Sequence, residues 1–156
     1  MPEQRIVLRN CGLVDPADVR SYLAGDGFQA IQKARQRMTP DEVVQEIKKS
    51  GLRGRGGAGF PTGTKWELAG KSPGKERYVI CNADEGEVGT FKDRYVLQND
   101  PFSLFEGIDI ACYAIGAVKA YLYVRDEYHY LLGQLNRALE QAKATGLLGC
   151  VIELRE

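Results

Sequence analysis

Residues 78–90 read Tyr78-Val-Ile-Cys-Asn-Ala-Asp-Glu-Gly-Glu-Val-Gly-Thr90, an apolar run that passes directly into a polar, acidic segment. The run Tyr78–Cys81 is short and continuous, which is typical of a strand buried in a sheet. The acidic segment then leaves this strand at its carboxyl end. Because ligands bind beyond the carboxyl ends of the strands in open α/β sheets, we expect a binding loop here.

Two more apolar runs follow downstream, at residues 120–124 and 151–154, and each is preceded by a helical pattern. The first helix is predicted from Pro101 to about Gly116, and the second from Tyr128 to Ala144. Strands that alternate with helices of this length predict an α/β fold with a mostly parallel sheet.

Residues 1–50 are predicted to form a segment of short helices. Asp15-Pro16 resembles a helix cap followed by proline at the first helical position. A second helix is expected from Phe28 to Arg37. A third is expected to begin at Thr39, because Glu42 stands three residues later and completes a capping box.

A glycine-rich stretch joins this helical segment to the first strand. It reads Ser50-Gly-Leu-Arg-Gly-Arg-Gly-Gly-Ala-Gly-Phe-Pro-Thr-Gly63, and six of the thirteen residues from 51 to 63 are glycine. Such a stretch is unsuited to a helix or strand interior and predicts a loop. Its GxGxxG match at 54, 56 and 59 follows a predicted helix and not a strand, so we do not expect a standard Rossmann unit.

The composition of this loop favours a binding role over a merely flexible surface loop. Backbone N–H groups without side chains can approach an anion or a flat ring closely. A helix is expected to begin at Pro61, and its start adds partial positive charge. Arg53, Arg55 and Lys65 bring formal positive charge to the same place.

The acidic segment is a second candidate binding element. Its side chains include an amide, Asn82, and the carboxylates of Asp84, Glu85, Glu87 and Asp93. These groups can accept hydrogen bonds from ribose hydroxyls or from the N–H edge of a ring. A magnesium site and a solvated acidic turn are competing interpretations, although no regular metal-loop spacing is present.

The bulk properties indicate a soluble globular domain. The chain has 156 residues, 44% of them hydrophobic, and 21 basic residues balance 21 acidic ones. A net charge of zero argues against binding to nucleic acid or to an anionic membrane. No apolar run is long enough to span a bilayer, and Met1-Pro-Glu-Gln-Arg5 does not resemble a signal peptide, so a cytoplasmic location is expected.

Cysteine, histidine and tyrosine give weaker signals. The cysteines at 11, 81, 112 and 150 form no CxxC pair, which favours ordinary thiols over iron–sulfur ligands. The single histidine, His129, is expected to be structural or on the surface. Tyr121 and Tyr123 share one face of their predicted strand, where core packing is favoured over stacking on a base.

Together the two loops resemble the NADH-binding, FMN-carrying subunit of respiratory complex I, which also occurs in NAD-linked formate dehydrogenases and in electron-bifurcating hydrogenases. Residues 53–66 resemble its flavin-binding signature, and residues 81–94 resemble its second motif. The resemblance implies a three-layer α/β/α FMN-binding domain over residues 51–156, preceded by the helical segment 1–50. The ubiquitin-like and four-cysteine 4Fe–4S domains of that family, with their cluster ligands, are expected to be absent.

The resemblance also implies roles for individual residues. FMN would contact Gly54, Arg55, Gly56, Gly57, Ala58 and Lys65 of the first motif. Asn82, Asp84 and Glu85 would hold its ribityl chain and ring edge, while Phe60 and Glu87 would face NADH. No side chain is expected to be a catalytic acid or base. Leu68 and Val88 depart from the family pattern, which has an aromatic residue and a proline at these positions.

The implied activity is hydride transfer from NADH to FMN, followed by the release of single electrons to iron–sulfur clusters. The implied partners are other subunits of a redox complex, including a thioredoxin-like 2Fe–2S subunit, and the complex would be peripheral to a membrane. A chain of this length is expected to be inactive alone as an NADH:quinone or ferredoxin-type oxidoreductase. A non-catalytic scaffold fragment and an unrelated binder of nucleotide phosphates are the alternatives.

Overall fold

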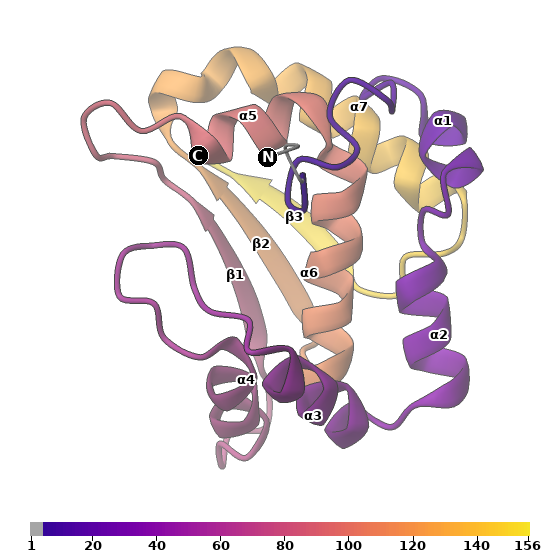
Figure 1. The fold of residues 1–156 in the computed structure, drawn as a ribbon, viewed down its shortest axis with the longest axis vertical. Coiled ribbons are helices and arrows are strands. Elements are labelled where there is room, and N and C mark those ends of the chain that lie inside the picture. Colours follow the sequence, from indigo (N-terminus) through magenta and orange to yellow (C-terminus); the bar gives the residue numbers. More distant parts are fainter. Residues whose placement is uncertain (1–4) are drawn as a thin grey trace.

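The computed structural model describes residues 5–156. These residues form seven helices, one 3-10 turn and three strands (Figure 1). In chain order the elements are α1 (Val19–Ala24), α2 (Gln29–Arg37), α3 (Pro40–Ser50), α4 (Thr62–Gly70), β1 (Tyr78–Ala83), α5 (Lys92–Asn99), α6 (Pro101–Ile115), β2 (Lys119–Val124), η1 (Asp126–Tyr128), α7 (His129–Ala144) and β3 (Val151–Arg155).

The three strands form one parallel sheet in the order β1-β2-β3. Ile80 pairs with Tyr121, and Tyr121 pairs with Glu153. The predicted α/β fold and parallel sheet are therefore confirmed. The element before the glycine-rich stretch is the helix α3, which agrees with the expectation that this is not a standard Rossmann unit.

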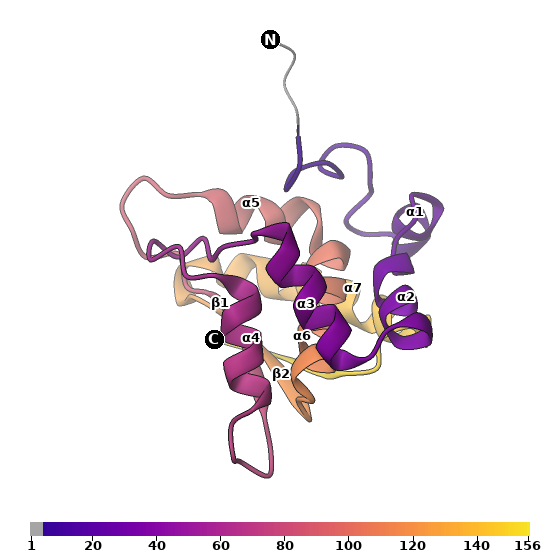
Figure 2. The same cartoon turned by 60° about the horizontal axis from the view of Figure 1, so that its bottom comes forward.

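Helices cover one face of this sheet. Both crossovers step by one strand in the same direction, so right-handed connections place α6 and α7 on the same side, as Figure 2 shows. Ala120, Leu122 and Val124 face these helices and are fully buried. Within residues 5–156, no helix covers the opposite face, so the second helical layer of the expected three-layer arrangement is not among the described residues.

The uncovered face carries the alternate residues of the strands. Ile80 is 69% exposed and Tyr123 is 40% exposed. The ring of Tyr121 stacks on that of Tyr78 with 6.2 Å between their centroids. The expectation that Tyr121 and Tyr123 pack in the core is therefore wrong, because the core lies on the helical side of the sheet.

Within residues 5–156, no helix has the length and apolar character needed to cross a bilayer.

A buried carboxylate on α6 attaches the N-terminal helices to the core. Glu106 Oε2 accepts hydrogen bonds from the Tyr22 hydroxyl (2.5 Å) and from the Phe28 N–H (2.9 Å). Its Oε1 accepts from the Ile31 N–H (3.0 Å). Phe28, the N-cap of α2, has a left-handed φ of 62° and offers no side-chain cap. Glu106 therefore caps α2 from a distant part of the sequence.

The helix boundaries show which of the predicted helix caps are present. The Thr39–Glu42 capping box is present at the start of α3, as predicted. Asp18, and not Asp15, caps α1, while Asp15 forms a turn with the N–H of Ala17. The helix α5 was not predicted from the sequence, because its N-cap residue, Phe91, has no capping side chain.

A close contact between α3 and α4 depends on a glycine. A Cβ added at Gly63 would lie 2.7 Å from the backbone nitrogen of Lys48 and 2.6 Å from its Cγ. Glu67 of α4 also pairs with Lys48 Nζ at 2.7 Å. The first turn of α4, which follows the glycine-rich stretch directly, is therefore held against α3.

We predict that Glu106→Ala lowers the free energy of unfolding by about 3 kcal/mol, because it leaves buried donors without an acceptor. Urea denaturation followed by circular dichroism measures this change. Glu140→Ala removes an exposed carboxylate on α7 and should cost less than about 0.5 kcal/mol. Equal stabilities for the two variants would contradict the role given to Glu106.

We also predict that Gly63→Ala lowers the free energy of unfolding by about 2 kcal/mol, because the backbone of Lys48 cannot move away cheaply. Gly107→Ala on α6 is the matched control, since a Cβ there meets no atom within 4 Å. That variant should be neutral or slightly stabilising, because alanine favours a helix more than glycine does. The same denaturation curves test both, and a stable Gly63→Ala variant would disprove the close contact.

Candidate cofactor site

The glycine-rich stretch forms a loop that is closed at its base. The Gly54 N–H donates to the carbonyl of Phe60, and the Thr62 N–H donates to the carbonyl of Leu52, both at 2.9 Å. The guanidinium of Arg53 donates to the carbonyl of Gly59 at 2.8 Å. Arg53 therefore braces the loop, whereas the sequence pattern suggested that it brings positive charge to a ligand.

The tip of this glycine loop, residues 54–60, is open. Gly57 and Gly59 have left-handed φ angles of 100° and 61°, which favour glycine. A Cβ added at Gly56, Gly57 or Gly59 would meet no atom within 4 Å. The backbone of the tip is thus accessible to a ligand.

The acidic loop, residues 84–91, begins where β1 ends. Asn82 Oδ1 accepts a hydrogen bond from the Asp84 N–H at 2.8 Å, which turns the chain out of the strand. Asp84 and Glu87 are exposed, so their carboxylates face solvent. Val88 at the tip is fully exposed.

Glu85 differs from its neighbours because it is buried. Its Oε1 accepts from the Asp93 N–H (2.8 Å), and its Oε2 accepts from the Arg94 N–H (3.2 Å) and from the Tyr128 hydroxyl (3.0 Å). Burial alone would raise the pKa of Glu85, but these hydrogen bonds outweigh it and hold the pKa below its ordinary value. Glu85 thus caps α5 and holds the acidic loop in place.

Residues after β2 support the acidic loop from the side. The guanidinium of Arg125 donates to the carbonyl of Glu85 and also pairs with Glu127. The ring of Tyr128 lies 5.7 Å from the guanidinium of Arg125 and 5.8 Å from that of Arg94. Sequence reasoning missed this support, although one signal existed: parallel pairing of β1 with β2 places the residues after both strands at the same edge.

A cavity of about 700 Å³ is lined by residues of both loops, by Val7 and Leu8 of the N-terminal segment, and by Tyr95 and Val96 of α5. Arg55 of the glycine loop lines it together with Gly89, Thr90, Phe91 and Lys92 beyond the acidic turn. Both loops also lie on the β1 side of the molecule in Figures 1 and 2. The structure therefore brings Arg55 and the end of the acidic loop to one shared cavity, and Arg55 is the one predicted FMN contact among the described residues that line it.

The predicted site residues separate into two groups. Most are exposed in the region of the two loops: Gly54, Arg55, Gly56, Gly57, Ala58, Phe60, Lys65, Asn82, Asp84 and Glu87. Lys65 lies in the first half of α4, whose start is positioned by Gly63. Glu85 is the exception, since both its oxygens bind groups of this chain. A flavin contact for any of these residues stays a prediction.

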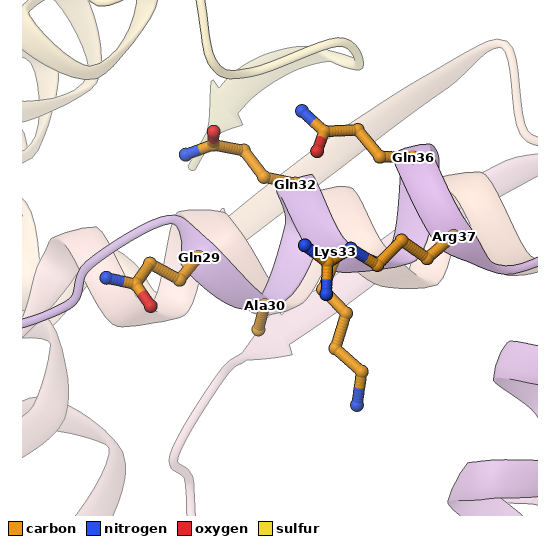
Figure 3. A pocket seen from close by; sticks show the side chains of 6 residues that line it. All are labelled: Gln29, Ala30, Gln32, Lys33, Gln36 and Arg37. Carbon is orange, nitrogen blue, oxygen red and sulfur yellow. The ribbon is translucent and has the colours of Figure 1, made fainter.

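Two other features do not form part of this site. A hollow of about 390 Å³ lies along α2, but the side chains that line it all come from that one helix and fan outward (Figure 3). Within residues 5–156, no side chains of the acidic loop belong to a group of three that could hold a metal ion. The group that could do so is exposed and consists of Asp126, His129 and Glu156.

Comparison with known proteins matches the sequence to one family. Residues 47–156 match the model of the Nuo51 FMN-binding domain. The chain is 49% identical over 144 residues to an NADH-quinone oxidoreductase subunit of Rhizobium meliloti (strain 1021), covering 92% of this chain and 34% of that protein. It is 48% identical over 145 residues to the HndC subunit of the NADP-reducing hydrogenase of Solidesulfovibrio fructosivorans, covering 93% and 29%.

A solved structure agrees with these matches. The crystal structure of an NAD+-reducing NiFe-hydrogenase in the H2-reduced state superimposes with a TM-score of 0.72 at 46% identity, covering 86% of this chain and 24% of that one. The chain thus spans about a third or less of these relatives. Because the family model matches most of the chain, and matches both loops of the site, the chain belongs to the family of the Nuo51 FMN-binding domain.

Proposed function

We propose that this chain forms the FMN-cradling part of an electron-input subunit that takes electrons from NADH. The observation that carries the proposal is the shared cavity, in which Arg55 of the open glycine loop meets the end of the acidic loop. A ligand beyond the carboxyl end of β1, where ligands of α/β sheets bind, would meet both loops, although they are far apart in sequence.

The groups on the two loops fit FMN. The open backbone at Gly56 to Gly59 can lie against a flat ring or an anion, and Arg55 and Lys65 can neutralise a phosphate. Asn82 and Asp84 offer oxygen acceptors to ribityl hydroxyls. Glu85 would act through the acidic loop, which it holds in place by capping α5.

FMN, when bound, can accept a hydride from NADH and release the two electrons singly. The chain itself would supply binding and orientation. Phe60 is 49% exposed beside the glycine loop and offers a face on which a nicotinamide ring could stack. The exposed carboxylate of Glu87 offers an acceptor for ribose hydroxyls. No proton transfer by a side chain is needed.

The relatives support membership in a multi-subunit redox complex. One is named as a subunit of an NADH-quinone oxidoreductase and another as a subunit of a hydrogenase. We propose that the electrons leave toward iron–sulfur clusters, including that of a thioredoxin-like 2Fe–2S subunit, in a cytoplasmic complex peripheral to a membrane. The cluster ligands would come from outside residues 1–156.

The alternative is a scaffold that keeps the fold without the cofactor. Such a scaffold would fold and bind a partner subunit without binding FMN. A binder of other nucleotide phosphates would prefer ATP to FMN. Flavin binding by the purified chain, measured both alone and with the remaining two thirds of a relative added in trans, separates these cases.

We predict that Arg55→Ala weakens FMN binding by about 10- to 100-fold, because it removes a charged hydrogen-bond donor from the shared cavity. Quenching of flavin fluorescence during titration measures the affinity. Lys33→Ala on α2 is the matched control, since it removes an exposed charge from the hollow in Figure 3. That control should bind within twofold of the unmodified chain, and equal losses in both variants would count against a site at Arg55.

We predict that Glu85→Gln reduces the acid sensitivity of the protein. The folded pKa of Glu85 is lowered, so its ionised form stabilises the fold above the ordinary value of 4.5, and this contribution is lost as the pH falls below it. The difference in stability between the unmodified chain and the variant should therefore shrink between about pH 5 and pH 3. Urea midpoints across this range measure it.

Tyr128→Phe provides an intermediate case for the same series. It removes one of the three hydrogen-bond donors to the Glu85 carboxylate and leaves that carboxylate in place. Its pH curve should lie between those of the unmodified chain and Glu85→Gln. Parallel curves for all three proteins would mean that Glu85 is not held in its ionised form by these bonds.

A further inference from the structure

Two of the four cysteines meet outside the cofactor region. Cys112 lies in α6, and Cys150 lies directly before β3. Their Sγ atoms are 2.7 Å apart, although 38 residues separate them in sequence. Both are free thiols. Because a disulfide bond measures about 2.05 Å, only a small movement of the side chains would be needed to join them.

The backbone around Cys150 is held against α6 by a buried carboxylate. Asp109 stands one turn before Cys112 on the same helix and accepts from the N–H groups of Gly149 (3.1 Å) and Cys150 (2.8 Å). Arg35 of α2 pairs with Asp109 at 2.7 Å and donates to the carbonyl of Leu147 at 2.8 Å. The two thiols are therefore brought together by a fixed frame and not by the chance position of a mobile end.

A side chain at position 149 would require Arg35 to move from its place in this frame. A Cβ added at Gly149 would collide with the guanidinium of Arg35. The glycine thus allows Arg35 to reach Asp109 while the next residue, Cys150, turns its sulfur toward α6. The geometry of the pair depends on residues from α2, α6 and the segment before β3.

A small reagent can reach the pair. A cavity of about 290 Å³ lies beside it and is lined by both cysteines together with Arg35 and Asp109. Cys150 is partly exposed, whereas Cys112 is 2% exposed. Cys150 is therefore the thiol that an incoming oxidant meets first, and Cys112 is the buried thiol that can complete a second step.

We propose that Cys112 and Cys150 form a reversible disulfide and that this pair is a site of redox modification in the chain. The Cys150 thiolate attacks a small-molecule disulfide and releases one reagent thiol, and the Cys112 thiolate then displaces the second. Two Sγ–H bonds and the reagent's S–S bond are lost, and one protein S–S bond forms. The two electrons and two protons from the cysteines appear in two reagent thiols.

The consequence of the bond would be a covalent link between α6 and the entry to β3. Burial raises the pKa of both thiols, so exchange with the reagent should be slow near neutral pH and faster as the pH rises. A cross-link across 38 residues restricts the unfolded chain, so the oxidised form should melt several degrees higher.

The test uses the complete chain, incubated with oxidised glutathione and then alkylated under denaturing conditions. We expect the number of alkylated thiols to fall from four to two, the melting temperature to rise, and a reducing agent to reverse both. Peptide mapping should find Cys112 linked to Cys150. Retention of all four thiols after incubation at pH 9, or a link between any other two cysteines, would overturn the proposal.

Two variants test the assignment of the disulfide to Cys112 and Cys150, so the test does not depend on whether one particular variant folds. A chain with Cys11→Ser and Cys81→Ser keeps only the proposed pair and should lose both its thiols on oxidation. Cys112→Ser should stop at a mixed disulfide between Cys150 and glutathione, without the rise in melting temperature. If the first variant keeps its thiols, or if Cys112→Ser melts as high as the oxidised unmodified chain, the cross-link is not formed by these residues.

Discussion

The carboxyl group of Glu106 lies in the core, where a polar group is tolerated only when hydrogen-bond partners surround it. The Tyr22 hydroxyl and the N–H groups of Phe28 and Ile31 meet this need. The same constraint applies to the other buried acids, which accept hydrogen bonds from distant parts of the chain. Asp100 accepts from Asn10 and Asp109 from Cys150. Because Asp100 caps α6 and the other two lie on it, this helix organises both the N-terminal segment and the entry to β3.

Glu85 extends the same principle to the cofactor region. It is a buried acid in an otherwise exposed loop, and it caps α5, the helix that follows the loop. With Arg125 on its carbonyl and Tyr128 on its carboxylate, the base of the acidic loop is fixed while Asp84 and Glu87 remain open to solvent. A rigid base with an accessible tip is the arrangement that a preorganised binding loop requires.

Much of this architecture was predictable from local sequence. The three strands, the capping box at Thr39, the helix that begins at Pro101 and the helix that ends at Ala144 all follow from patterns that act over a few residues. Apart from the cap of α1, the missed features depend on contacts with residues outside the element concerned. The helix α5 is capped by Glu85 and α2 by Glu106, and neither cap has a signal at the start of its own helix. Whether the face of the sheet that carries Tyr121 is buried depends on which face the crossovers cover.

The same distinction applies to the site. The sequence indicated both loops and their chemistry, but not that Arg53 would brace the glycine loop or that Gly63 would hold α4 against α3. Nor did it indicate that Arg125 and Tyr128 would support the acidic loop. These residues are positioned by the pairing of β1 with β2 and by helix packing, which no single motif encodes.

We propose that the glycine loop and the acidic loop form one FMN site. Hydrogen exchange of the chain with and without FMN, resolved to short peptides by mass spectrometry, tests it most directly. We expect FMN to slow exchange in residues 54–60 and in residues 84–94 together, at the same flavin concentration, while residues 29–37 of α2 are unchanged. Protection confined to one loop, or protection of α2 with both loops unchanged, would contradict it.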